Sequence, residues 1–296
     1  MDKTELRPVV VIGAGGQLGY DLVRILRQKR WSVIPLTHQQ LEIKDDRQVK
    51  RMLGRLKPEV VINTAAFHHL PNCETNPQEA FAVNMLGVSH LASWCKDNEV
   101  VLVHFSTDYV FGGDVKRRRA YTETDPVAPQ SLYAVSKVAG EMMVQTMLKR
   151  HFIIRTSGLY GAAGSAAKGG NFVERMIAKA KSGETIHMVD DQVLSPTYTV
   201  NLAENVARLI KTDKFGLYHA VSGGQCSWYE FTKEIFRLLA MQVKVVPVKS
   251  NHKQAGAVRP AYSVLSTDKL TSLGINTMRH WRENLKLYLQ EKGYLA

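Results

Sequence analysis

The sequence predicts an α/β fold of the Rossmann type: a doubly wound parallel sheet with helices on both faces and a smaller α/β lobe formed by the C-terminal segments. Three observations predict it. Short β-branched runs alternate with longer helical patterns through the first half of the chain. These runs are apolar throughout, as expected for strands that are buried on both faces. The first run leads into a glycine-rich turn and then a helix. Right-handed crossovers between parallel strands then give a doubly wound sheet.

The first half of the chain is expected to contain five strands and four helices. The helix over 45–56 begins with Asp45 and Asp46, and acidic residues favour a helix N-terminus. The strands are predicted over 8–12, 31–36, 60–62, 100–105 and 152–154. The helices are predicted over 17–29, 45–56, 78–95 and 131–149.

Composition narrows the functional classes. No apolar run approaches the roughly 20 residues that cross a bilayer, and the N-terminal run enters a glycine turn instead of a signal-peptide cleavage site. The three cysteines, Cys73, Cys95 and Cys226, are too few and too scattered for a disulfide framework or a zinc site, which favours the cytoplasm and no metal. The net charge of +12 is spread along the chain, apart from residues 116–119, which we expect to form a solvated loop. We therefore expect no membrane and no nucleic acid as partner.

The turn after the first strand has the pattern of a dinucleotide site. Gly13, Gly16 and Gly19 are spaced G-x-x-G-x-x-G, which permits a tight turn, close approach of a pyrophosphate and close helix packing. The free amides of the following helix would face the anion. The alternative is a tight turn in another α/β fold. No acidic residue stands at Thr37 or His38, where it would favour NAD, so NADPH is the favoured cofactor and NADH a second candidate.

The second half of the chain is less regular. Residues 161–170 form a small-residue loop that we expect to be flexible. Helices are predicted over 171–181, 200–210, 228–239 and 278–290, and strands over 217–220 and 243–248. We assign residues 1–160 and 191–220 to the dinucleotide-binding domain, and residues 161–190 and 221–296 to a substrate-binding lobe.

A tyrosine and a lysine four residues apart supply the candidate proton-transfer group. Tyr133 and Lys137 share one face at the start of a predicted helix. An ammonium beside the phenol would lower the tyrosine pKa and suit it for proton transfer. The spacing alone also occurs by chance. A hydroxyl from Ser106 or Thr107, at the carboxyl end of the fourth strand, strengthens the hypothesis because ligands of open α/β sheets bind there.

These motifs together resemble the extended short-chain dehydrogenases and, more closely, the dTDP-4-dehydrorhamnose reductase family. The similarity runs from about residue 9 to 290. The matching segments are residues 13–19, 63–66, 106–111, 133–141, 155–161, 171–173, 191–198, 227–231 and 259–263. The Tyr/Lys pair belongs to the whole superfamily, whereas residues 191–198 and 227–231 are more particular to this branch.

The resemblance implies a role for each matching residue. Tyr133 would donate a proton to the C4 carbonyl oxygen of a nucleotide-linked sugar, Lys137 would hold the nicotinamide ribose, and Thr107 would assist. The implied cofactor-binding residues are Gly13, Gly16, Gln17, Leu18, Gly19, Thr37, Glu42, Ile43, Ala65, Ala66, Phe67, Ser106, Tyr133 and Lys137. The implied substrate-binding residues are Thr107, Asp108, Tyr133, Asn171 and Arg259.

The implied reaction is NAD(P)H-dependent reduction of dTDP-4-dehydro-L-rhamnose to dTDP-L-rhamnose. Three departures from the family pattern, Ala134, Gly158 and Val258, bear on the identity of the sugar. Two alternatives stay open: a nucleotide-sugar epimerase or dehydratase of the same fold, and a dinucleotide-binding regulatory subunit similar to the β subunit of methionine adenosyltransferase. The sequence leaves the oligomeric state open and is compatible with a homodimer.

Overall fold

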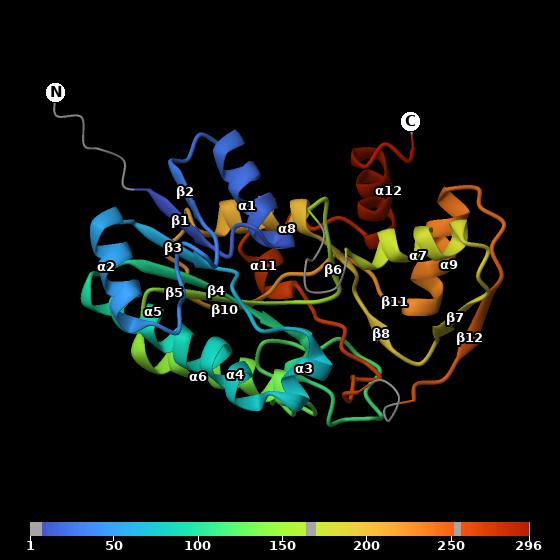
Figure 1. Cartoon of the computed structure of the whole chain (residues 1–296), viewed down its shortest axis with the longest axis horizontal. Coiled ribbons are helices and arrows are strands. Elements are labelled where there is room, and N and C mark those ends of the chain that lie inside the picture. The colour runs from blue at the N-terminus through green and yellow to red at the C-terminus, as the bar shows by residue number, and fades with distance from the viewer. Residues whose placement is uncertain (1–7, 164–169, 252–255, 296) are drawn as a thin grey trace.

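A six-stranded parallel sheet forms the centre of the computed structural model, which describes residues 8–163, 170–251 and 256–295 (Figure 1). Its strand order is β10-β5-β4-β3-β1-β2, and every neighbouring pair is parallel. The strands are β1 (Val9–Ile12), β2 (Val33–Leu36), β3 (Val60–Asn63), β4 (Val101–Thr107), β5 (His151–Thr156) and β10 (Gly216–His219). The order reverses beside β1, so the predicted doubly wound parallel sheet is confirmed.

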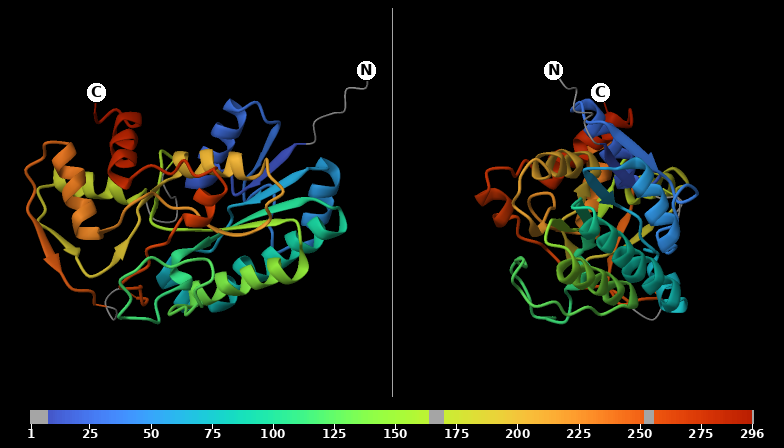
Figure 2. Two further views of the ribbon diagram at one scale, coloured as in Figure 1. Left: turned by 180° about the vertical axis from the view of Figure 1, so that it is seen from behind. Right: turned by 90° about the vertical axis from the view of Figure 1, so that its left-hand side faces the viewer.

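Helices cover both faces of the sheet, and each face has its own apolar core (Figure 2). On one face lie α1 (Gln17–Gln28), α8 (Thr199–Leu209) and α11 (Asp268–Ser272). On the other lie α2 (Asp46–Leu56), α5 (Val88–Asp97) and α6 (Leu132–Met147). Side chains that alternate along β4 divide between the two cores, with Val103 in one and Leu102 in the other. The apolar strand runs in the sequence therefore reflect burial on both faces.

The expected helix over 78–95 is interrupted. It consists of α4 (Pro77–Phe81), the π-helix η1 (Ala82–Gly87) and α5, and it is preceded by a short unpredicted helix, α3 (Leu70–Thr75). The π-turn lies where Asn84 enters the core beneath the site, and such turns are common at functional positions. The helix boundaries elsewhere follow local caps: Asp45 caps α2, and Ser131 caps α6 by accepting a hydrogen bond from Ala134 N.

The lobe has a separate core at one end of the molecule (Figure 1). It contains α7 (Phe172–Lys181), α9 (Trp228–Leu238), α12 (Trp281–Glu291) and the parallel pair β7 (Ile186–Val189) and β12 (Val245–Val248). Two short pairs adjoin it: β6 (Leu159–Tyr160) with β9 (Thr197–Tyr198), and β8 (Val193–Leu194) with β11 (Cys226–Ser227). On the basis of these separate cores we propose that the chain forms a sheet domain and a lobe, as predicted, with one change to the predicted bounds. Leu270 of α11 packs in the core of the sheet, although residues 221–296 were all assigned to the lobe.

Two further expectations from the sequence concern the loop over 161–170 and the absence of a membrane-spanning segment. Most of the small-residue loop over 161–170 lies outside the described residues, so its expected flexibility stays a prediction. Among the described helices, none is long and apolar enough to cross a membrane.

Candidate functional site

A cleft of about 1370 Å³ lies between the carboxyl ends of β1, β3, β4 and β5 and the lobe. Every residue for which the sequence suggested a binding or catalytic role lines this cleft. Those residues are Gly13, Gly16, Gln17, Leu18, Gly19, Thr37, Glu42, Ile43, Ala65, Ala66, Phe67, Ser106, Thr107, Asp108, Tyr133, Lys137, Asn171 and Arg259. The fold therefore brings together segments as distant as the first glycine turn and residue 259, in the place where open α/β sheets bind ligands.

The glycine turn is shaped for a ligand that approaches the backbone. Gly13 has a φ of +78°, and a Cβ there would lie 2.6 Å from Thr64 Oγ1. A Cβ on Gly19 would collide with the carbonyl oxygen of Gly13 and lie 2.8 Å from Ala14 Cα. Gly16 precedes α1 in an extended conformation, and no side chain caps this helix. The first amides of α1 are therefore left for an external acceptor, as a pyrophosphate would provide.

Four polar side-chain atoms in the cleft wall have no partner among the described residues. They are Gln17 Oε1, His69 Nδ1, Ser106 Oγ and Thr156 Oγ1, and all four are buried. Buried polar groups of native proteins are nearly always paired, so these atoms indicate a bound molecule. Thr156 was not among the predicted site residues. Its position at the carboxyl end of β5, in register with Thr107, is the feature of the sequence that could have indicated it.

The end of β2 bears on the choice of cofactor. Thr37 N and Oγ1 both donate to Gln40 Oε1, at 2.9 and 3.1 Å, and no carboxylate occupies position 37. The His38 side chain is 82% exposed and pairs with Glu42 at 2.9 Å. Burial acts to raise the pKa of Glu42, but hydrogen bonds from Lys44 N and His38 outweigh it and lower that pKa. Glu42, the acidic residue that follows β2 in the chain, is therefore already bound by His38 and Lys44.

Tyr133 and Lys137 lie one turn apart on α6, but they do not interact as the sequence suggested. Burial raises the pKa of Tyr133, and a hydrogen bond with Thr107 only partly offsets it. Lys137 Nζ donates to Phe105 O at 2.7 Å and lies 3.3 Å from His104 Nε2. Burial dominates the pKa of Tyr133, so the expected lowering of that pKa by Lys137 is not found.

Lys137 is itself unusual because its side-chain amine is buried. Its side chain is in the core, and burial lowers its pKa to about 8, against the attraction of Glu141. Glu141 in turn accepts two hydrogen bonds from Arg155, at 2.7 and 2.9 Å. The attraction of Glu141, which Arg155 also binds, therefore only partly offsets the effect of burial on the Lys137 pKa.

Asp108 lines the cleft and accepts hydrogen bonds from three neighbouring hydroxyls. Its Oδ1 accepts from Thr107 Oγ1 at 3.1 Å, and its Oδ2 accepts from Ser157 and Ser263 at 2.7 and 2.6 Å. Burial raises the pKa of Asp108 to about 6, although these hydroxyl donors act in the opposite direction. All of the described contacts of this carboxylate orient neighbouring hydroxyls, and its expected contact with a sugar stays a prediction.

Asn171 also has a structural role where substrate binding was expected. Its Oδ1 accepts from Glu174 N and caps α7, and its Nδ2 donates to Gly161 O and Tyr288 OH at 2.9 and 2.7 Å. Both amide hydrogens are used within the protein, and the expected contact of Asn171, which lines the cleft, with a substrate stays a prediction. Arg259 does line the cleft, where it interacts with Tyr109.

Asn84 joins the end of β3 to α6. Its Nδ2 donates to Phe67 O and Ser136 Oγ at 2.8 and 3.0 Å, and its Oδ1 accepts from Phe67 N at 2.9 Å. A Cβ on Gly140 would collide with the carbonyl oxygen of Asn84, so the glycine allows α6 to pack closely on η1. These contacts fix the helix that presents Tyr133 to the cleft.

The lobe provides an aromatic wall. Trp228 and Phe172 line the cleft with ring centroids 4.4 Å apart. Trp228 also packs against the lobe core. Gly158 has a φ of +53°, and a Cβ there would lie 2.8 Å from Leu194 Cδ1. A larger residue at this position would therefore need a different arrangement of the wall.

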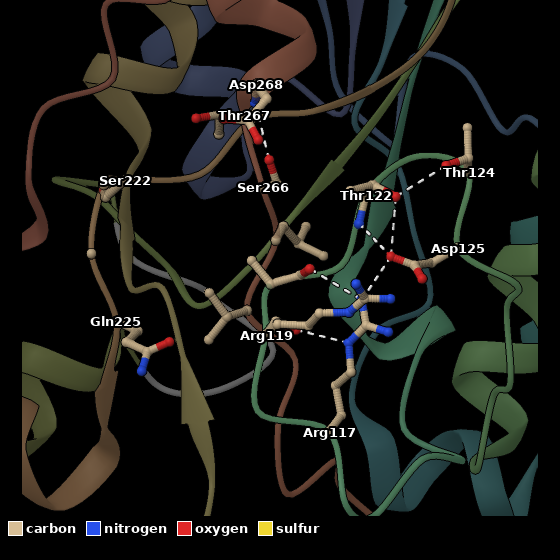
Figure 3. A pocket seen from close by; sticks show the side chains of 15 residues that line it. Arg117, Arg119, Thr122, Thr124, Asp125, Ser222, Gln225, Ser266, Thr267 and Asp268 are labelled. Carbon is tan, nitrogen blue, oxygen red and sulfur yellow. Dashed lines mark hydrogen bonds and ion pairs between the residues drawn. The ribbon is translucent and has the colours of Figure 1, made fainter.

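A second pocket, of about 780 Å³, lies beside the segment 116–119 (Figure 3). Arg117, expected in a solvated loop, is largely buried: it pairs with Asp125 at 2.7 Å and stacks over Tyr121 at 4.3 Å. Arg119 also faces this pocket. Among the described residues, no group of three His, Cys, Asp or Glu side chains could hold a metal ion, here or in the main cleft.

Comparison with known proteins identifies the family. The model of the RmlD substrate binding domain matches residues 7–293. The chain belongs to this family. The RmlD-type chain is 40% identical over 285 residues to the spore coat polysaccharide biosynthesis protein SpsK of Bacillus subtilis, covering 96% of this chain and 98% of that protein. It is 37% identical to the dTDP-4-keto-6-deoxy-D-glucose reductase of Streptomyces niveus, covering 92% and 93%.

A solved structure agrees with this RmlD-type assignment. The dTDP-4-dehydrorhamnose reductase of Bacillus anthracis, crystallised in complex with NADP, is 36% identical and superposes with a TM-score of 0.91 over 96% of this chain and 99% of that one. The resemblance to the dTDP-4-dehydrorhamnose reductase family inferred from the motifs is thus confirmed.

Proposed function

We propose that the protein is an oxidoreductase that uses NADPH to reduce the C4 keto group of a dTDP-linked 6-deoxy sugar, with dTDP-4-dehydro-L-rhamnose as substrate and dTDP-L-rhamnose as product. The observation that carries the proposal is the meeting of the glycine turn, the Tyr133 and Thr107 hydroxyls and the aromatic lobe wall in one cleft. The similarity to reductases that act on dTDP-4-keto sugars supports it. NADH is a second candidate cofactor.

The cleft residues fit the cofactor. The amides at the start of α1 would bind its pyrophosphate, and the unpartnered Ser106 and Thr156 hydroxyls would bind the part of the cofactor nearest the sheet. The open environment of Thr37 and His38 would accept a 2′-phosphate, since no carboxylate at position 37 repels it. When bound, the reduced nicotinamide supplies the hydride for C4.

The protein itself supplies the proton. Tyr133 would donate its phenolic hydrogen to the carbonyl oxygen as the C4 carbonyl becomes an alcohol, and the phenolate would regain a proton from solvent before the next turnover. Thr107 donates its hydroxyl hydrogen to Asp108 in the structure, and it would share the hydrogen bonding to the carbonyl oxygen once that hydroxyl turns toward the substrate. Burial raises the pKa of Tyr133, so the phenol is protonated and has a hydrogen to donate.

The lobe would recognise the nucleotide. Phe172 and Trp228 offer ring faces to a base, and Arg175, Lys249 and Arg259 offer positive charge to a diphosphate along the same wall. An aromatic wall with cationic neighbours fits a ligand that combines a base with a diphosphate. This combination favours a nucleotide-linked sugar over a free sugar.

The decisive assay is the loss of reduced-nicotinamide absorbance when enzyme, NADPH and dTDP-4-dehydro-L-rhamnose are mixed. We expect turnover by the native protein and a loss of about 100-fold or more in kcat for Tyr133→Phe, as for removal of a positioned proton donor. Tyr121→Phe is the matched control, since its buried hydroxyl has no partner among the described residues. Tight NADPH binding without oxidation of NADPH would contradict the proposal and favour the regulatory-subunit alternative.

Two further expectations belong to this proposal. We place the enzyme in the cytoplasm, because its three cysteines are all buried and unpaired and reduced nicotinamide cofactors are available there. A homodimer is the expected alternative to a monomer. Light scattering on the eluting protein peak distinguishes the two.

A further inference from the structure

The basic run over residues 116–119 has no part in the main cleft, but two of its arginines face the second pocket, of about 780 Å³ (Figure 3). The lining residues of this pocket come from three segments: 117–125 before α6, 222–225 after β10, and 264–268 at the start of α11. None of them also lines the main cleft. A small molecule can therefore occupy this pocket while a cofactor and a substrate occupy the cleft.

Backbone hydrogen bonds between distant segments hold the walls of the pocket. Tyr121 N donates to Val264 O at 2.8 Å, and Ser266 N donates to Tyr121 O at 2.7 Å. In the segment after β10, Gly223 N donates to Arg279 O at 2.9 Å. The walls are therefore already formed by the fold, and a ligand would not have to order them on binding.

Arg117 is fixed at one end of the pocket. Its Nη2 donates to Asp125 Oδ2 at 2.7 Å and to Ala120 O at 3.1 Å, and its Nε donates to Arg119 O at 2.8 Å. The guanidinium also lies 4.3 Å from the centre of the Tyr121 ring. Its other amino nitrogen, Nη1, makes no hydrogen bond within the described residues. An immobilised arginine thus keeps one donor group for a ligand.

Arg119 adds a positive charge that no carboxylate compensates. Its guanidinium has no hydrogen bond or ion pair with the part of the chain that the structure describes. Arg118 differs, because its Nη1 turns back and donates to carbonyl oxygens of its own loop. Gln225 also lines the pocket, and its Oε1 accepts from Tyr262 OH at 2.8 Å, which leaves Nε2 as a donor. Donors of this kind, two of them on arginines, suit an oxyanion.

A different set of polar groups lies across the pocket from the two arginines (Figure 3). Ser266 Oγ accepts from Asp268 N at 3.1 Å, and Thr267 Oγ1 accepts from Asn276 Nδ2 at 3.2 Å. Both hydroxyl hydrogens therefore have no acceptor among the described residues. The Asp268 carboxylate likewise accepts no hydrogen bond from them. Hydroxyl donors beside a carboxylate acceptor suit the hydroxyl groups of a sugar.

The pocket does not offer a place for a nucleotide base. Its described lining contains no aromatic side chain, whereas Phe172 and Trp228 present ring faces in the main cleft. Its volume of about 780 Å³ is also smaller than the 1370 Å³ of that cleft. A ligand with an anionic group and several hydroxyls, but no base, fits these walls.

We propose that this pocket is a second ligand site, which binds a phosphorylated sugar. The phosphate contacts Arg117, Arg119 and Gln225, and the hydroxyl groups of the sugar contact residues 266–268. A phosphate fits better than a carboxylate because its three terminal oxygens can accept from all three donor side chains at once. The proposal goes beyond the reductase function and does not depend on it.

Isothermal titration calorimetry of the full chain with α-D-glucose 1-phosphate tests the site. We expect saturable binding with a Kd of about 1 mM or lower, and binding at least about tenfold weaker in Arg119→Ala, which loses a hydrogen bond between charged groups. Arg118→Ala is the matched control: it removes the same charge from the same loop, but its guanidinium faces that loop's own backbone, so it should bind like the native protein. An unchanged Tm in both variants verifies the fold.

Further titrations separate the two ends of the ligand. Asp268→Asn should weaken the binding of glucose 1-phosphate about fivefold without weakening that of inorganic phosphate, whereas Arg119→Ala should weaken both. Glucose itself should show no saturable binding. The proposal would be overturned by absence of glucose 1-phosphate binding, by equal losses in the two arginine variants, or by equal affinity for inorganic phosphate and glucose 1-phosphate. No turnover is measured, so failure of the reductase proposal would leave these results unaffected.

Discussion

Gly19→Ala is the substitution whose effect the structure predicts most directly. Gly19 is the third residue of α1, and an added methyl group would strike the carbonyl oxygen of Gly13 and approach Ala14 Cα to 2.8 Å. Carbon atoms in contact normally stay about 3.5–4.0 Å apart, so the start of α1 must move by roughly 1 Å. The obstructing atoms are all backbone, and no side chain can rotate to make room. The amides that would hold a pyrophosphate move with the helix.

The magnitude follows from these contacts. Forcing a methyl group against fixed atoms costs about 2–3 kcal/mol, of which about 1 kcal/mol returns because alanine restricts the unfolded chain. The net loss in the free energy of unfolding is then about 1–2 kcal/mol. Loss of one hydrogen bond to a charged group weakens binding by about 1.5–3 kcal/mol, so the Kd for NADPH should rise about tenfold or more.

Chemical denaturation and NADPH titration measure both effects. Gly54→Ala is the matched control, because Gly54 lies in α2 with no atom within 4 Å of an added Cβ. It should stabilise the protein by about 0.5–1 kcal/mol and leave the Kd unchanged. If Gly19→Ala matched the control in stability and bound NADPH like the native protein, the account of the glycine turn would be refuted.

Three other predictions follow from the site. Thr37→Asp should weaken NADPH binding about tenfold while sparing NADH, because a carboxylate there repels a 2′-phosphate; equal losses in the two titrations would contradict the assigned cofactor end. The folded pKa of about 6 for Asp108 lies above its ordinary 3.8, so its contribution to stability is greatest below about pH 4 and is lost as the pH rises to about 6. In urea denaturation across this range, Asp108→Asn should remove that slope, and a slope equal to the native one would count against a buried Asp108. Glu141→Gln should destabilise the protein by about 3–5 kcal/mol, because Arg155 would stay buried without its carboxylate; a loss below about 1 kcal/mol, as for a surface pair, would show that the pair is not buried in solution.

The sequence predicted the parts of the fold that depend on local pattern. Apolar β-branched runs located the first five strands of the central sheet, because strands buried on both faces need no polar alternation. The sixth strand, β10, was predicted over 217–220 from a short run without β-branched residues. The glycine spacing located the turn after β1, because only glycine fits where Gly13 and Gly19 touch other backbone. The Tyr133 and Lys137 spacing placed both residues on α6, since residues four apart share a helix face.

The parts that sequence reasoning missed depend on residues distant in the chain. Asp108 is held by Ser157 and Ser263, which lie 49 and 155 positions away, so nothing near it indicated a positioning role. Asn171 contacts Tyr288, 117 positions away, for the same reason. The direction of Lys137 Nζ depends on a histidine of β4 that packs beneath α6. Helical spacing places two side chains on one face but does not say which group each contacts.

Transfer of deuterium from NADPH that carries deuterium at both hydrogen positions of nicotinamide C4 tests the reductase account most directly. The enzyme is incubated with labelled cofactor and dTDP-4-dehydro-L-rhamnose, and the sugar is analysed by NMR and mass spectrometry. The account predicts dTDP-L-rhamnose with one deuterium at C4, formed by the native protein and by Tyr121→Phe and lost in Tyr133→Phe. An unlabelled sugar despite bound NADPH, or deuterium at another carbon, would contradict it.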